Sequence, residues 1–170
     1  FKARTAVLTL PIGVLQQNRI EFDPSLPAPK VNAIENIMSG GMIKVVIEFQ
    51  SAFWEDTVGR VPYFHNPPSS PFRLFLSLFW NRPGPPTLTT SCGYPYAPEV
   101  TGDPDRVRSM LFDTLGEMFP DVDLESELVG LHIADWPSDP WTMGAHSCVP
   151  VGGHQLRADL AAPTPPGRPS

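Results

Sequence analysis

Proline is the residue type that most restricts how this chain can fold. The 170 residues include 22 prolines, which gather in residues 62–71, 83–98, 137–150 and 163–169. A proline fixes its own φ angle and donates no backbone hydrogen bond, so it ends helices and is excluded from the interior of a sheet. This distribution predicts short strands and loops with few long helices. Residues 161–170 combine four prolines with little apolar content and are expected to be disordered.

The hydrophobic pattern between the prolines predicts strands and two helices. The clearest strand is residues 42–49, where β-branched residues predominate. One helix is expected from Pro29 to Gly40–Gly41, and another begins with Asp103 as its N-cap and ends at Pro120. The other strands are expected at residues 5–10, 60–64, 72–80, 87–92 and 128–133. The third of these is apolar on both faces, which predicts a central strand. Strands with a few helices on one side indicate an α+β fold with a mixed or antiparallel sheet.

Charge and hydropathy argue against two classes of partner. The net charge is −6 and no basic stripe is present, so no nucleic-acid partner is expected. No apolar stretch approaches the roughly 20 residues that span a bilayer, so no membrane partner is expected either. The sequence carries no secretory signal, which favours the cytoplasm. Its first residue is Phe1, so we expect the natural protein to begin before this sequence.

Cysteines and histidines do not predict a metal site. Cys92 and Cys148 lack metal-ligand spacing and are expected to be buried free thiols. The histidines are scattered along the chain, at His65, His132, His146 and His154. Such scattered residues do not match the spacing of a zinc site, so no metal is expected.

The stretch from Asp135 to Cys148 reads Asp-Trp-Pro-Ser-Asp-Pro-Trp-Thr-Met-Gly-Ala-His-Ser-Cys. It resembles the late segment of the flavin-dependent amine oxidases, where a Trp precedes an Asp-Pro-aromatic corner, a Gly and a polar tail. Two earlier stretches resemble the same family, namely Leu-Pro-Ile-Gly-Val-Leu at residues 10–15 and Phe-Asp-Pro-Ser-Leu-Pro at residues 22–27. The resemblance covers most of residues 4–160.

The resemblance implies a function and a division of the chain. The implied function is the substrate-binding portion of an FAD-dependent enzyme that oxidises the C–N bond of an amine to an imine by hydride transfer to the flavin. A small-molecule amine is the implied substrate, while its identity and the oligomeric state stay open. Residues 1–14 would connect from the FAD-binding domain and residues 15–135 would form the substrate-binding domain. Residues 136–160 would return toward the flavin, and residues 161–170 would form the proline-rich end.

For Lys44, the strand pattern and the family resemblance predict different roles. Strand alternation places it on one face with Met42, Val46 and Glu48, as for an ordinary surface lysine near a glutamate. The resemblance instead implies a catalytic, cofactor-binding lysine that holds a water close to flavin N5, where positive charge stabilises developing negative charge. The residues that match this family pattern are Gly40, Lys44, Val45, Ile47, Phe49, Phe53 and Trp54.

Three further residues are implied on the substrate side. The resemblance places Trp136 near both the isoalloxazine and the substrate channel, and Trp80 at the substrate cavity. Aromatic walls exclude water and offer π-faces to a cationic amine, although a packed core aromatic is the alternative for each. His146 occupies the position of the first Tyr in the family's aromatic cage. It would admit a polar or acidic substrate feature, and a packed, hydrogen-bonded histidine is the alternative.

Two other functions stay open. An L-amino-acid oxidase relative would need an arginine for the substrate carboxylate, and the sequence does not rank Arg60, Arg73 and Arg82 for that role. A non-catalytic binding module without flavin is the alternative outside enzymes. No stretch matches the G-x-G-x-x-G turn that brings backbone amides to a dinucleotide pyrophosphate. We therefore expect FAD to be bound mainly by regions absent from this chain.

Overall fold

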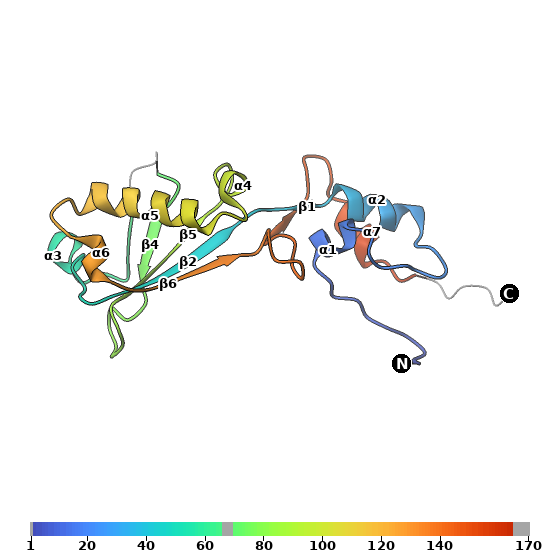
Figure 1. The fold of residues 1–170 in the computed structure, drawn as a ribbon. Helices are drawn as coiled ribbons and strands as arrows, with labels where there is room; N and C mark the ends of the chain where they lie inside the picture. The colour runs from blue at the N-terminus through green and yellow to red at the C-terminus, as the bar shows by residue number, and fades with distance from the viewer. Residues whose placement is uncertain (1, 66–69, 165–170) are drawn as a thin grey trace. The chain divides into compact units, whose positions relative to one another are not determined.

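The computed structural model of the chain describes residues 2–65 and 70–164, which form two compact units (Figure 1). Residues Phe1–Gly40 and Pro137–Ser170 make up the first, called here the terminal unit. Residues Gly41–Trp136 make up the second, called the sheet unit. The compact units therefore divide at Gly40 and Trp136, whereas the functional division expected from the sequence stays a prediction.

The sheet unit is built on a five-stranded antiparallel sheet with strand order β3-β4-β5-β2-β6. Its strands are β2 (Ile43–Phe49), β3 (Tyr63–His65), β4 (Leu74–Ser77), β5 (Thr87–Cys92) and β6 (Leu128–Asp135). Together with the helices of this unit, the sheet confirms the α+β class and the antiparallel pairing. β2 is an interior strand, because β5 and β6 pair with it on its two sides.

One face of this sheet is covered by helix α5 (Pro104–Met118), as Figure 1 shows. Alternate residues of β2, among them Ile43 and Val45, are fully buried on this face with Leu111 and Leu115 of α5. Burying an aliphatic side chain of this size stabilises a fold by about 1.5–3 kcal/mol. The expected helix start is confirmed, since the Asp103 side chain accepts a hydrogen bond from the backbone N–H of Arg106 at 2.9 Å.

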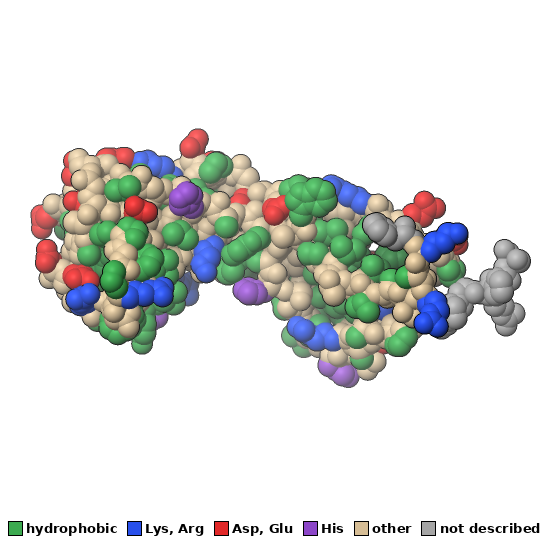
Figure 2. Space-filling view, turned by 90° about the horizontal axis from the view of Figure 1, so that it is seen from below, with side chains coloured by type: hydrophobic (Ala, Val, Ile, Leu, Met, Phe, Trp, Pro, Cys, Tyr) green, Lys and Arg blue, Asp and Glu red, His purple; other side chains and the backbone are tan. Residues whose placement is uncertain are grey.

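The opposite face is called here the open face. Its exposed side chains are Lys44, Tyr63, His65, Leu74, Leu76, Ser91, His132 and Ala134. Figure 2 views the molecule from below relative to Figure 1, and hydrophobic side chains lie there among charged and histidine side chains. The open face is thus partly apolar, although none of the described helices of the sheet unit lies over it.

Three short helices complete the sheet unit: α3 (Glu55–Val58), α4 (Ala97–Val100) and α6 (Leu124–Glu127). α6 begins at Asp123, whose side chain accepts hydrogen bonds from the backbone N–H and the hydroxyl of Ser126. The hydroxyl bond favours the charged carboxylate and lowers the pKa of Asp123. Asp123 therefore acts as a helix cap.

The terminal unit joins segments from both ends of the sequence. Its elements are α1 (Ile12–Gln16), α2 (Ala28–Asn36), β1 (Met38–Ser39), β7 (Ser147–Cys148) and α7 (Leu156–Ala161). β1 and β7 form a two-stranded antiparallel sheet. The small core comprises Ile12, Ala33, Ile34, Ile37 and Leu156. Lys30 of α2 donates hydrogen bonds to the carbonyls of Leu160 and Ala162, which satisfies the C-terminal end of α7.

Several expectations from the sequence were wrong. Residues 5–10 form no strand; Val7 is 89% exposed there, because no described segment supplies a pairing strand. The strand expected at 72–80 is the shorter β4, which is an interior strand because β3 and β5 pair with it. Its outward residues Leu74 and Leu76 are exposed on the open face, so the apolar run does not reflect burial on both sides.

Other boundaries moved by a few residues. The helix expected to end at Gly40–Gly41 stops at Asn36, because Met38 pairs with Cys148 in the two-stranded sheet. The strand expected at 60–64 begins at Tyr63, after Pro62, which cannot donate a hydrogen bond. Of the end expected to be disordered, residues 165–170 lie outside the described residues. In the part of the chain that the structure describes, no helix is long and apolar enough to cross a membrane.

Candidate active site on the open face

Lys44 projects from the open face of an interior strand. Its cross-strand partners are Ser91 on β5 and Ala134 on β6, which are both small. Its side chain is exposed, and within residues 2–65 and 70–164 no hydrogen bond or ion pair holds its ammonium group. Glu48 lies four residues along the same strand, or about 13 Å away at 3.3 Å per residue. The ammonium is thus left available in a row of small side chains.

Trp136 follows the strand that flanks Lys44. Lys44 pairs with Ala134 near the end of β6, and Trp136 is the first residue of the turn after that strand. The end of β6 is held by Asp135, whose carboxylate accepts a hydrogen bond from the backbone N–H of Gly102 at 2.6 Å. The half-buried Trp136 therefore lies at the Lys44 end of the sheet.

Trp80 lies at the other end of the sheet, in the turn between β4 and β5. Its carbonyl oxygen accepts a hydrogen bond from Arg60 Nε at 2.6 Å. It lines a cavity of about 490 Å³ together with Thr87, the cross-strand partner of Glu48. Because Glu48 and Lys44 are about 13 Å apart along β2, the sheet does not bring Trp80 next to Lys44.

His146 belongs to the terminal unit, where its main chain is fixed and its side chain is exposed. The carbonyl of His146 accepts a hydrogen bond from Gly40 N–H at 2.7 Å, and Ala145 N–H donates to the Gly40 carbonyl at 2.8 Å. Gly144, which lies two residues before His146, has a φ of +140°, and a Cβ there would lie 1.9 Å from Ser39 Oγ. The glycine of the motif is therefore required by the backbone, and the main chain presents the His146 ring outward.

The fold separates Arg73 from the other two arginines considered for a carboxylate. Arg60 and Arg82 line the cavity that contains Trp80. Arg73 lines a smaller cavity of about 210 Å³ together with Ser91, the cross-strand partner of Lys44. Sequence reasoning missed Ser91 and Ala134, because strand alternation alone does not reveal which residues lie opposite each other.

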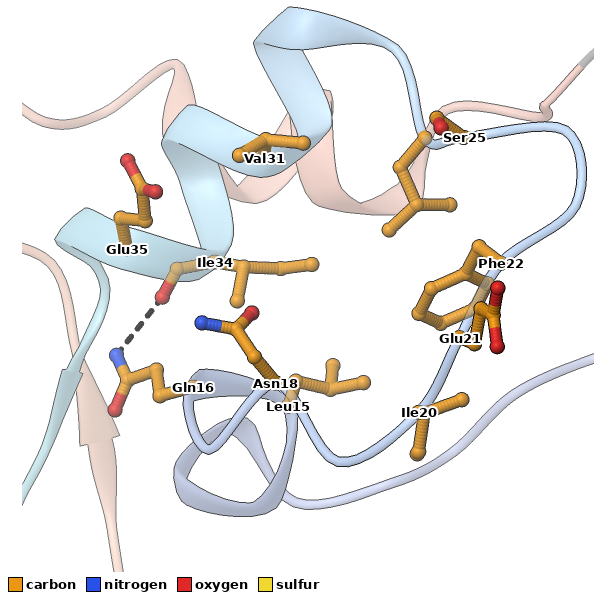
Figure 3. A pocket seen from close by; sticks show the side chains of 11 residues that line it. Leu15, Gln16, Asn18, Ile20, Glu21, Phe22, Ser25, Val31, Ile34 and Glu35 are labelled. Atoms are coloured by element: carbon orange, nitrogen blue, oxygen red, sulfur yellow. Dashed lines mark hydrogen bonds between the residues drawn. The ribbon is translucent and has the colours of Figure 1, made fainter.

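A larger cavity of about 550 Å³ lies in the terminal unit, between α1, α2 and the loop that joins them (Figure 3). Leu15, Phe22 and Ile34 contribute its apolar walls. The side-chain amide of Gln16 donates hydrogen bonds to the carbonyls of Ile34 and Ile37, at 2.8 and 2.7 Å. This contact joins α1 to the end of α2, so Gln16 has a structural role, and none of the predicted site residues lines the cavity.

The two cysteines differ in environment, and the expectation that both are buried was wrong. Cys92 is fully buried on the face of β5 that α5 covers, whereas Cys148 is exposed at the β1–β7 pair. Burial, and next the negative charge of Glu99, raise the pKa of the Cys92 thiol from its ordinary value of 9.0 to about 11. A thiol that stays protonated and buried is a poor nucleophile, so Cys92 is a core residue.

We expect iodoacetamide to modify one cysteine of the native chain, Cys148, and both cysteines after unfolding. Mass spectrometry of the alkylated peptides measures this directly, with Cys148→Ser and Cys92→Ser as matched controls. Because the folded state raises the Cys92 pKa, its contribution to stability is complete below pH 9 and falls as the pH rises from 9 toward 11. Rapid labelling of Cys92 in native protein at neutral pH would show that the covered face is open.

Comparison with known proteins identifies the family of the chain. A family model described as flavin containing amine oxidoreductase matches residues 1–169. Lysine-specific histone demethylase 2 of Homo sapiens is 27% identical over 167 residues, covering 95% of this chain and 20% of that protein. Polyamine oxidase 5 of Oryza sativa subsp. japonica is 32% identical over 155 residues, covering 89% of this chain and 30% of that protein.

Solved structures share the fold. Putrescine oxidase bound to putrescine matches with a TM-score of 0.72 and 21% identity, covering 93% of this chain and 34% of that one. Cyclohexylamine oxidase from Brevibacterium oxydans IH-35A matches with a TM-score of 0.70 and 21% identity, covering 91% and 34%. The chain thus spans between a fifth and about a third of the length of these proteins. With the family matched over almost every residue, the chain belongs to the flavin-containing amine oxidoreductases.

Proposed function

We propose that this chain forms the substrate-facing sheet of an FAD-dependent enzyme that oxidises the C–N bond of an amine. The observation that carries the proposal is the Lys44 ammonium, which projects from an interior strand and has no partner among the described residues. Family membership and the solved amine oxidases of the same fold support this reading.

The residues around Lys44 suit the edge of a flavin ring. Ser91 and Ala134 are small, so a planar group can approach the ammonium between them. The ammonium has three donors and no acceptor, and it can hold a water or stabilise a developing negative charge. The chemistry that a bound flavin supplies is acceptance of a hydride from the carbon next to the amine nitrogen, which leaves an imine. Lys44 would provide the fixed charge for that step.

Trp136, Trp80 and His146 are assigned to the substrate side. The half-buried Trp136 would form an aromatic wall at the Lys44 end of the sheet, and Trp80 would form one at the other end. Their faces attract a cationic amine and exclude water. His146 is exposed and adds a ring whose nitrogens can form hydrogen bonds with a polar feature of the substrate.

The long FAD molecule would be held mainly by residues outside this chain. Dinucleotide pyrophosphates are bound by a glycine-rich turn at a helix N-terminus, and the 170 residues contain no G-x-G-x-x-G stretch. In this proposal Lys44 and Trp136 contact the reactive ring, while other parts of the protein bind the pyrophosphate. The substrate would be a small-molecule amine.

The proposal is tested with the flavin-bound protein that carries this chain. On anaerobic mixing with a panel of amines, at least one amine is expected to bleach the oxidised flavin absorbance, with the matching aldehyde appearing after hydrolysis of the imine. A panel of mono-, di- and polyamines that leaves the flavin oxidised would contradict the proposal and favour a non-catalytic binding module.

A further inference from the structure

The sheet unit holds arginines in two cavities, and their surroundings differ. In the cavity of about 490 Å³, Arg60 Nε donates to the Trp80 carbonyl at 2.6 Å and lies 3.9 Å from a carboxylate oxygen of Glu55. In the same cavity the Arg82 guanidinium lies over the Phe79 ring at 5.1 Å. These contacts already engage both cationic groups, and a carboxylate of the protein lies among them.

The cavity of about 210 Å³ offers a different arrangement. It is lined by Arg73, Ser91, Tyr94 and Tyr96 among others, and its lining includes no carboxylate. No hydrogen bond or ion pair joins the Arg73 guanidinium to another of the described residues. The guanidinium is planar and has five donors in a fork that matches a carboxylate. Ser91 and Tyr94 are exposed and add hydroxyl groups.

This cavity lies at the same end of the sheet as Lys44. Ser91 pairs directly with Lys44, and the register of Leu76 with Thr89 brings Leu74, the residue after Arg73, beside Ser91. β5 lies between β4 and β2, so two strand spacings of about 4.8 Å separate these strands. The backbone at the Arg73 end of β4 is therefore about 10 Å from the backbone of Lys44. Arg60 and Arg82 line the cavity at the Glu48 end, which is about 13 Å farther along the strand.

We propose that the Arg73 cavity binds a carboxylate of the substrate, so that the preferred amine carries an acidic group. This inference rests on the proposed function, because the ligand is a substrate only if the protein oxidises amines. A volume of about 210 Å³ accommodates a carboxylate on a short carbon chain, since one water occupies about 30 Å³ in the liquid. Arg73 is then a specificity-determining residue.

The first test measures binding and needs no catalysis. Propionate is titrated into the flavin-bound protein that carries this chain and followed by NMR, with Arg73→Gln as the test variant and Arg60→Gln as the matched control. We expect Arg73→Gln to weaken propionate binding at least tenfold, Arg73→Lys to be intermediate because it loses the fork, and Arg60→Gln to bind as the unaltered chain does. Equal binding by the unaltered chain and Arg73→Gln would overturn the proposal. Tighter binding of inorganic phosphate than of propionate would overturn the carboxylate assignment.

The second test measures specificity in the flavin-bound protein. The ratio of kcat/KM for an amine with a terminal carboxylate to kcat/KM for its neutral amide is expected to fall at least tenfold in Arg73→Gln. An unchanged ratio would refute the role of Arg73 in specificity. If no amine is oxidised at all, the proposed function fails, whereas the propionate titration still decides whether the cavity binds carboxylates.

Discussion

Replacement of Lys44 by Met in the flavin-bound protein is expected to slow flavin reduction or reoxidation by about 100-fold. A charge-assisted interaction made mainly in the transition state is worth a few kcal/mol, and each 1.36 kcal/mol corresponds to about a factor of ten in rate. Stopped-flow absorbance measures the two half-reactions separately. Because the Lys44 side chain is exposed and has no partner among the described residues, the substitution should leave the thermal unfolding temperature nearly unchanged.

A matched control lies on the same strand and face. Glu48→Gln removes a charge about 13 Å from Lys44 and should change both half-reactions by less than a factor of two. Lys44→Arg keeps the positive charge with a different shape, and partial activity is expected. Rates of Lys44→Met within a factor of two of wild type in both half-reactions would remove Lys44 from the chemistry.

Substitution of Leu111 by Ala is expected to lower the free energy of unfolding of the chain by about 2–5 kcal/mol. Leu111 is fully buried where α5 packs on the sheet, so its truncation removes apolar contacts and leaves a cavity. Small domains are stable by only about 5–15 kcal/mol, and a loss of this size is therefore a large part of the total. Urea denaturation followed by circular dichroism measures it.

The open face provides the control for this stability measurement. Leu76 is 38% exposed on β4, and its truncation to Ala should cost less than about 1 kcal/mol in the same chain. The chemical change is identical, so the difference between the two variants reports which face of the sheet is covered. Equal losses for Leu111→Ala and Leu76→Ala would mean that both faces are buried in solution.

The sequence predicted the elements whose signals are local. The strand expected at 42–49 is observed as β2 (Ile43–Phe49). A run of β-branched residues favours a strand by itself, without contacts from residues far away in the sequence. The helix at α5 was predicted from Asp103 and Pro104, which form a cap within one turn. Family membership also followed from short motifs, because each depends on neighbouring residues such as those from Asp135 to Cys148.

The roles of the predicted site residues stay predictions, but the fold changes how they relate to one another. Lys44 and Trp136 lie at one end of the sheet, and Trp80 lies at the other. The sequence could not show this, because the neighbours of a strand residue depend on which strands pair and in which register. His146 is described within the terminal unit, where its backbone bonds to Gly40 from a distant part of the chain.

By itself, the sequence determined the local elements and the family, because periodicity, capping and motifs are properties of adjacent residues. Tertiary structure decided that residues 5–10 form no strand, since a strand exists only where another segment accepts its hydrogen bonds. It also decided which face of the sheet is open and which arginine lines a cavity at the Lys44 end of the sheet. Those properties depend on contacts between residues far apart in the chain, such as Lys44 with Ser91 and Ala134, and no local pattern specifies them.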